Sequence, residues 1–132
     1  MQEPPTPLTQ ESLSSESDSI HPEDVIYKIC VMVPSPFLEP VKNAMFIAGA
    51  GRYGQYDCCC WQTLGTGQFR PLEGSTPFSG KSGEVHREET WKVEMICEKR
   101  FLKQVVQALR QAHPYEIPAF DLYPVKLSDP EE

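Results

Sequence analysis

The stretch that decides the fold runs from residue 89 to residue 113 and reads ETWKVEMICEKRFLKQVVQALRQAH. Its first nine residues alternate between polar and mostly apolar side chains, which predicts a β-strand over 89–97. The pattern then takes the helical period until Pro114, so that we expect an amphipathic helix over 100–113. The apolar stripe of this helix consists of Leu102, Val105, Val106, Leu109 and Ala112.

The remaining segments complete a regular order of elements. We expect strands over 27–33, 56–64 and 119–125 and a long glycine-rich loop over 65–83. We also expect a helix that starts at Ser35-Pro36 and ends at Gly49. The apolar face of this helix carries Phe37, Val41, Ala44, Met45 and Ala48. The order β-α-β-β-α-β is that of the ferredoxin-like α+β fold. It places two helices on one face of a four-stranded antiparallel sheet.

The predicted strand over 56–64 is apolar on both of its faces. Tyr56, Cys58 and Cys60 lie on one phase of the alternation, and Cys59 and Trp61 lie on the other. Because both helices lie on the same face of the sheet, the opposite face must be solvated, lined by small residues or covered by another subunit, and the apolar residues on both phases favour the last of these. We therefore expect the protein to self-associate.

Charge is unevenly distributed along the 132 residues. The formal net charge is -7, but residues 1–24 carry -6 and residues 127–132 carry -3, which leaves +2 for residues 25–126. The first segment also holds four prolines and five serines with few large apolar residues, and we predict a disordered acidic tail there. Residues 25–126 then form the domain, and 127–132 a short acidic C-terminal tail. A nearly neutral domain gives no reason to expect a nucleic-acid partner.

The sequence also indicates a cellular location. No apolar run approaches the roughly 18–20 residues that a membrane span needs, and we expect no membrane partner. The N-terminus has neither the basic nor the apolar region of a secretory signal. The five cysteines, an odd number, then indicate reduced thiols in the cytosol or the nucleus.

Gly49 to Gly54 match the pattern G-x-G-x-x-G. A dinucleotide-binding fingerprint follows a strand and opens a helix, whereas these glycines follow a predicted helix. A helix cap and a tight turn therefore explain the pattern. An anion contact through Arg52 and the loop amides stays open as the alternative.

The cysteine run at 58–60 has two interpretations. In a strand, Cys58 and Cys60 would point to the same face and could share a soft metal across a symmetric interface. Buried small apolar thiols are the simpler alternative. No further cysteine or histidine pair completes the four ligands of a structural zinc site.

His113 ends the second predicted helix, where the helix dipole stabilises a protonated imidazole. With Glu116 and Asp121 it could instead form an acid–base or metal cluster. His86 lies in a polar stretch and is expected to be solvated. The sequence contains no complete catalytic motif and no recognisable nucleophile pair.

Three uncommon motifs occur in succession. They are GAGRYGQYD over 49–57, GTGQFRPL over 65–72 with Gly74, Pro77 and Gly80 behind it, and HPYEIPAFD over 113–121. Through them residues 27–125 resemble the domain inserted in proteins of the Nif-three family (YqfO-like, NGG-interacting-factor-like proteins). The resemblance implies a CutA/PII-like, trimer-forming domain with a regulatory or ligand-binding role. The family positions that it carries over are Gly51, Arg52, Tyr53, Gly54, Gly67, Phe69, Arg70, Pro71, His113, Pro114, Tyr115, Glu116 and Asp121.

The sequence departs from the full-length family in one respect. Those proteins surround the inserted domain with a larger α/β domain that bears a two-metal site, and they are often called homologues of a type-two GTP cyclohydrolase. With three histidines and no flanking length, this chain offers no counterpart to that site. We therefore expect a protein that is not an enzyme, and we assign no catalytic residue and no cofactor.

Three functional hypotheses follow. In the first, the protein is a non-enzymatic homotrimer that binds a small molecule or metal between subunits. In the second, it is an adaptor whose acidic tail over 1–24 binds a partner protein. In the third, it is a hydrolase that uses His113 and Glu116 with a metal. The expected ligand contacts are Arg52, Tyr53, Gly67, Phe69, Arg70, His113, Tyr115, Glu116 and Asp121, and the candidate metal ligands are Cys58, Cys60 and His113.

Overall fold

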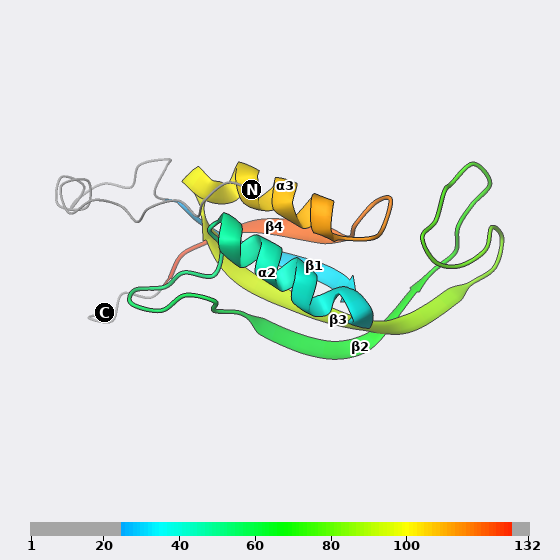
Figure 1. Ribbon diagram of the computed structural model, residues 1–132, viewed down its shortest axis with the longest axis horizontal. Helices are drawn as coiled ribbons and strands as arrows, with labels where there is room; N and C mark the ends of the chain where they lie inside the picture. Colours follow the sequence, from blue (N-terminus) through cyan, green and yellow to red (C-terminus); the bar gives the residue numbers. More distant parts are fainter. Residues whose placement is uncertain (1–24, 128–132) are drawn as a thin grey trace.

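The computed structural model describes residues 25–127, and the two predicted acidic tails lie almost wholly outside them. Its elements are β1 (Ile26–Pro34), the 3-10 turn η2 (Ser35–Phe37), α2 (Leu38–Ala48), β2 (Trp61–Phe69), β3 (His86–Glu98), α3 (Lys99–Ala112) and β4 (Phe120–Val125). The strands form one antiparallel sheet in the order β2-β3-β1-β4, and α2 and α3 lie side by side on one of its faces (Figure 1). The ferredoxin-like fold is confirmed.

The core fills the layer between the helices and the sheet. Alternate residues of the two central strands point into it, and both helices contribute one residue per turn. These side chains are Ile29, Val31, Val33, Leu38, Val41, Met45, Val93, Met95, Cys97, Phe101, Val105 and Leu109. A fully buried aliphatic or aromatic side chain of this size stabilises the fold by about 1.5–3 kcal/mol. The strand alternation predicted from the sequence is therefore the one that builds the core.

The first α-helix begins two residues later than the sequence predicted, since the predicted helix had Ser35 as its cap and Pro36 as its first residue. Ser35 to Phe37 form the 3-10 turn, and α2 starts at Leu38. Pro40 then falls in the first helical turn, where a backbone N–H has no partner within the helix to lose. At the other end Gly49 takes a φ of 125°, which favours glycine, and it caps the helix as predicted.

The prediction of a strand over 56–64 was wrong in its bounds. Residues 51–59 form an irregular segment, which two backbone hydrogen bonds hold at the end of the sheet: Gly51 N donates to Ile96 O at 2.8 Å, and Cys59 N donates to Gly51 O at 2.8 Å. Cys58 has a φ of 56°, which is left-handed and not extended. The strand therefore begins only at Trp61.

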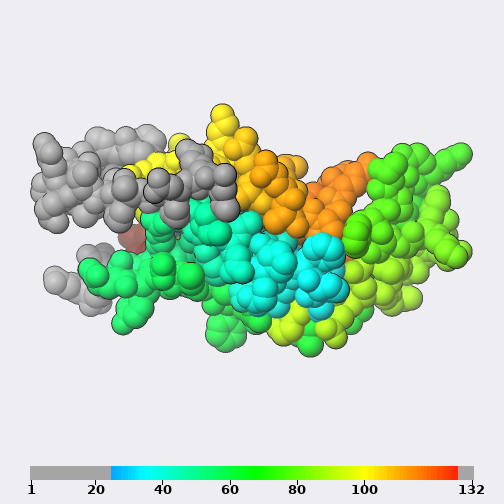
Figure 2. All heavy atoms as spheres, in the orientation of Figure 1, coloured from blue at the N-terminus to red at the C-terminus, as the bar shows by residue number. Residues whose placement is uncertain are grey.

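The loop predicted over 65–83 is also shorter than expected. Its first residues, 65–69, continue β2 and pair with the start of β3. This position needs a glycine, because the Cβ of any larger residue at Gly67 would lie 2.5 Å from the hydroxyl oxygen of Thr90. The β2–β3 ribbon consequently runs beyond the helices (Figure 1), and the loop at its tip lies against the end of the helical layer (Figure 2). This extension creates the site described below.

The sheet face away from the helices has no covering element within residues 25–127. It carries Met32, Trp61 and Tyr123, all of them exposed, and Trp61 keeps 68% of its accessible surface. No helix in the described part of the chain is long and apolar enough to cross a membrane. That another copy of the chain covers this face stays a prediction.

Candidate functional site

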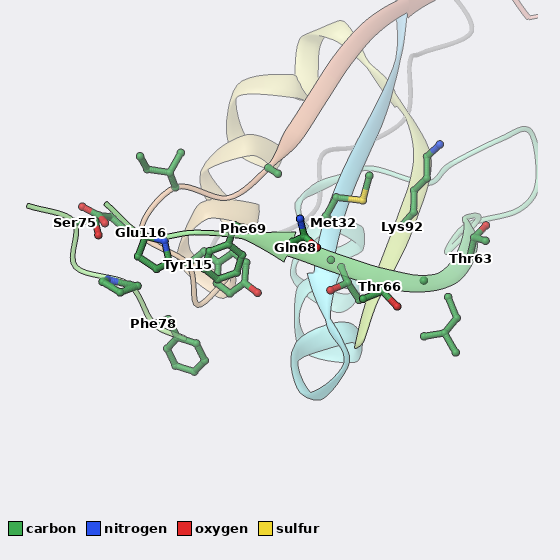
Figure 3. A pocket seen from close by; sticks show the side chains of 18 of the residues that line it. Met32, Thr63, Thr66, Gln68, Phe69, Ser75, Phe78, Lys92, Tyr115 and Glu116 are labelled. Carbon is green, nitrogen blue, oxygen red and sulfur yellow. The ribbon is translucent and has the colours of Figure 1, made fainter. Parts of the chain in front are cut away.

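A hollow of about 720 Å³ lies on the uncovered face and extends along the paired strands β2 and β3 from Thr63 and Glu94 to Phe69 in the projecting ribbon. Its walls come from the β2–β3 ribbon, from the loop over 71–78 and from the segment over 115–119 (Figure 3). Apolar groups form most of the wall: Met32, Leu64, Phe69, Phe78, Tyr115 and Ile117. Polar side chains, among them Lys92, Glu94 and Glu116, are few. We refer to this cavity as the hollow.

Packed aromatic rings hold the loop against the end of the sheet. The ring centroids of Phe69 and Tyr115 are 5.6 Å apart, those of Phe78 and Tyr115 are 6.5 Å apart, and Phe37 on the helical side meets Phe78 edge-on at 5.4 Å. Each such pair contributes about 0.5–1.5 kcal/mol beyond its buried area. The hollow is thus bounded by a preformed aromatic wall.

Tyr115 and Glu116 add polar ties to this wall. Burial, together with a hydrogen bond to the Glu88 carboxylate, raises the pKa of Tyr115, so that its phenol stays protonated and donates to Glu88. The Glu116 carboxylate accepts a hydrogen bond from the backbone N–H of Thr76 at 3.0 Å. These contacts join the HPYE segment to the ribbon and to the loop.

His113, directly after α3, joins the end of this helix to β1 and to the segment that carries Tyr115. Its Nε2 donates to the carbonyl of Met32 at 2.7 Å, and its Nδ1 accepts from the backbone N–H of Tyr115 at 3.2 Å. Burial lowers the pKa of His113 although the Met32 carbonyl opposes this effect. The sequence-based expectation of a protonated imidazole stabilised by the helix dipole was therefore wrong. A neutral ring with both nitrogens occupied positions Tyr115.

His86 also differs from its predicted environment. It is half-buried, and not simply solvated, because its ring packs 5.1 Å from the ring of Phe69. Its Nε2 lies 2.8 Å from a carboxylate oxygen of Glu88. Glu88 thus links His86 to Tyr115, and the aromatic character of the surrounding residues was not visible from the polar stretch in which His86 occurs.

The structure divides the predicted site residues between the two ends of the sheet. Gly67, Phe69, Tyr115 and Glu116 line the hollow, His113 supports it, and Arg70 follows the end of β2. Arg52 and Tyr53 follow Gly51, whose N–H bonds Ile96 near the other end of β3. Gly67 pairs with Glu88, so the two groups are separated by eight residues of β3, about 26 Å. Asp121 lies on β4 opposite Cys30, apart from both groups.

The cysteine run is not a set of buried strand thiols, as its simpler interpretation assumed. Cys58 is exposed, and Cys59 and Cys60 are half-buried, because the segment that carries them leaves the sheet. Partial desolvation and the neighbouring Asp57 carboxylate raise the pKa of Cys58, which favours the thiol. Within residues 25–127 no three His, Cys, Asp or Glu side chains gather in a metal-holding arrangement, so Cys58, Cys60 and His113 form no such group in one chain.

Sequence reasoning missed several residues of the hollow. Met32, Phe78, Lys92 and Ile117 line it, yet none was singled out. Ile117 carried a usable signal, since it is a large apolar residue between the two prolines that follow the second helix. Met32 carried one too, because it belongs to the face of β1 that points away from the helices.

Comparisons with known proteins match the described core to one part of larger proteins. No family model matches the chain. A GTP cyclohydrolase 1 type 2 homolog of Halalkalibacterium halodurans is 43% identical over 100 residues, which cover 76% of this chain and 27% of that protein. The homolog of Bacillus subtilis is 37% identical over 120 residues, 89% of this chain and 32% of that protein. The chain thus spans about a quarter to a third of the length of these relatives.

Solved structures give the same result. A Bacillus cereus protein related to NIF3 superposes with a TM-score of 0.69 at 36% identity, over 79% of this chain and 26% of that one. CutA1 of Shewanella sp. SIB1 reaches 0.59 at 14% identity, over 85% and 90% of the two chains. GlnK of B. subtilis, solved in complex with ATP, reaches 0.52 at 13% identity, over 78% and 85%. The last two likenesses concern the fold alone.

Proposed function

Since the chain is homologous to one segment of the GTP cyclohydrolase 1 type 2 homologues and has a CutA- and GlnK-like fold, we propose that it is a non-enzymatic binding module. It acts as a homotrimer, and the hollow forms one wall of a cleft between subunits for a small molecule or ion. The observation that carries this proposal is the hollow itself, a preformed cavity of about 720 Å³ on the uncovered sheet face. Small-molecule sites commonly measure about 300–1,000 Å³ and combine apolar walls with few polar groups.

The chemistry of the wall favours one kind of ligand. Phe69 and Met32 offer an apolar surface, and the Lys92 ammonium stands at its rim (Figure 3). A molecule with a flat apolar part and an anionic group would meet both. Glu94 and Glu116 add acceptors for the hydroxyl or amino groups of such a ligand. A nucleotide, the ligand type of the GlnK complex, combines these features.

Exposed apolar side chains support the trimer. Ile117, which is 80% exposed, lines the hollow together with Leu64 and Phe78. Trp61, which is also exposed, lies beside the hollow, next to the lining residue Glu94. Contiguous apolar surface of this kind marks interaction sites on soluble proteins. The resemblance to the inserted domain of the Nif-three family supports three copies in particular.

The arrangement of potential metal-ligating and acid–base side chains among residues 25–127 supports a role without catalysis. No three metal-ligating side chains gather between residues 25 and 127, and both nitrogens of His113 are engaged by the backbone. The relatives named after a GTP cyclohydrolase are matched over about a quarter to a third of their length. Turnover of GTP by the protein supplied with Zn²⁺ or Mn²⁺ would contradict this part of the proposal.

Light scattering at micromolar concentration tests the assembly, and three times the 15.0 kDa chain mass is expected. Ligand binding is tested with the anionic apolar dye ANS and with ATP as probes. Gly65→Phe places a ring in the hollow, because Gly65 lines it and a Cβ at this position meets nothing within 4 Å. We expect it to abolish the binding of both probes, whereas Ile47→Phe on the outer face of α2 leaves binding intact. Equal binding by both variants would exclude the hollow as the ligand site.

A further inference from the structure

A hydrogen-bonded turn projects two tyrosines from the end of the sheet opposite the projecting ribbon. Tyr53 and Tyr56 donate hydrogen bonds to each other's carbonyls, both at 2.9 Å, and Gly54 between them takes a φ of 58°. The two side chains are 49% and 73% exposed, although the backbone that carries them is fixed. Neither side chain belongs to the core or to the hollow of its own chain. We call residues 53–56 the tyrosine turn.

We infer that the tyrosine turn of one copy docks into the hollow of a neighbouring copy. This inference rests on the proposed function, because it names the second wall of the cleft between subunits. Within one chain the two surfaces do not meet, because neither Tyr53 nor Tyr56 is among the residues that line the hollow. The turn lies beyond the Glu94 end of the hollow, in the loop that Figure 1 shows at the end of the sheet away from the ribbon tip.

The two surfaces fit in size. A cavity of about 720 Å³ can hold a drug-sized molecule, and two phenol rings occupy less than that. A tyrosine buries about 150–250 Å², so at their exposed fractions the two rings offer on the order of 250 Å². That is roughly a third of the 800 Å² that each partner contributes to a stable interface of standard size. Leu64, Phe78 and Ile117, all at least half exposed, supply the opposing apolar surface.

The polar groups fit as well. A tyrosine hydroxyl that enters an interface needs a hydrogen-bond partner. The hollow supplies acceptors in Glu94 and Glu116 and a donor in Lys92, all of which line it. The docked turn would therefore bury its rings against Phe69 and Tyr115 with its hydroxyls at the polar rim.

The geometry also determines the type of assembly. Turn and hollow are different surfaces of one chain, so their contact is head-to-tail, and such contacts form a ring where the rotation between neighbours closes and a filament where it does not. A ring of three agrees with the proposed homotrimer. It would bring the motif around Tyr53 next to the motifs around Phe69 and Tyr115, which the single chain keeps apart.

Two variants test the inference by mixing. Tyr53→Ser/Tyr56→Ser removes the turn's rings, and Ile117→Lys places a charge in the hollow at a position that is 80% exposed. Ile47→Ser, on the helical side, is the matched control and should assemble like the wild type. Each test variant alone should be monomeric where the wild type is a trimer, since losing one such tyrosine contact weakens an interface roughly 30-fold or more. A one-to-one mixture should form a heterodimer, because one intact turn then meets one intact hollow.

The experiment distinguishes a failure of this inference from a failure of the proposed trimer. A trimeric turn variant overturns the inference and leaves the proposed trimer standing. A mixture that stays monomeric also overturns it, because a two-fold contact, such as pairing of two β2 edges, is not restored by complementary variants. A monomeric wild type overturns the proposed assembly itself. Circular dichroism checks folding, and Tyr56→Ser alone, at the more exposed position, repeats the test with the smaller change.

Discussion

Two glycines of β2, two residues apart on the same face, should respond to alanine with opposite signs. A side chain at Gly65 meets nothing within 4 Å, whereas one at Gly67 would lie 2.5 Å from Thr90 Oγ1 and 3.2 Å from Thr90 Cβ. Thr90 is stiff at χ1, and its hydroxyl donates to the Glu88 carbonyl at 3.0 Å, so it cannot easily give way. The same mutation therefore meets open space at one position and a fixed side chain at the other.

The magnitudes follow from these contacts. Replacing a strand glycine by alanine raises the free energy of unfolding by about 0.5–1 kcal/mol, and we expect Gly65→Ala to show this full gain. Gly67→Ala adds an overpacking cost of about 1–3 kcal/mol, which exceeds that gain and leaves a net loss of up to about 2.5 kcal/mol. For a domain of about 100 residues, 1 kcal/mol corresponds to about 4–8 °C in Tm. The two variants should thus differ in Tm by roughly 10 °C.

Thermal and urea unfolding, compared at one fixed protein concentration, measure the difference. The double variant Gly67→Ala/Thr90→Ala removes the hydroxyl that causes the clash, so a double-mutant cycle should show a coupling of about 1 kcal/mol between the two sites. If Gly65→Ala destabilised the protein as much as Gly67→Ala, or if the cycle showed no coupling, the assigned register of β2 on β3 would be wrong.

Three further predictions concern single side chains. The pKa of His113 is lowered in the folded state from its ordinary value of 6.5, so below about pH 6.5 the unfolded chain binds more protons than the folded one. The free energy of unfolding should therefore fall as the pH decreases below about 6.5. Urea unfolding at a series of pH values should show this slope in the wild type and a weaker one in His113→Gln. Iodoacetamide should modify Cys58 in the native protein, as mass spectrometry of the labelled peptides would show, while Cys97 reacts only after unfolding because burial raises its pKa to about 12 and blocks access. Phe101→Ala should cost about 3–5 kcal/mol in urea unfolding, and a loss below about 1 kcal/mol would show that this ring is not part of the core.

The contacts of the hollow explain why part of the site could be predicted and part could not. Phe69, Tyr115 and Glu116 stand in motifs that the resemblance singled out, and they do lie together. Phe78 joins them only because the loop folds back onto the ribbon, where Glu116 binds the backbone of Thr76. No spacing in the sequence encodes that contact, since the two residues are separated by 40 positions.

The order of the elements and the buried face of each follow from the sequence alone. Val93 and Met95 alternate with charged neighbours, and Val105 and Leu109 recur with the helical period, because the sheet and the helices each have one apolar face to bury. The bounds of β2, in contrast, depend on contacts between segments that are distant in the sequence. Glycines in a sequence suggest a loop, but at Gly67 the missing side chain makes room for Thr90 of the neighbouring strand. That pairing lengthens the ribbon, and the lengthened ribbon forms the hollow.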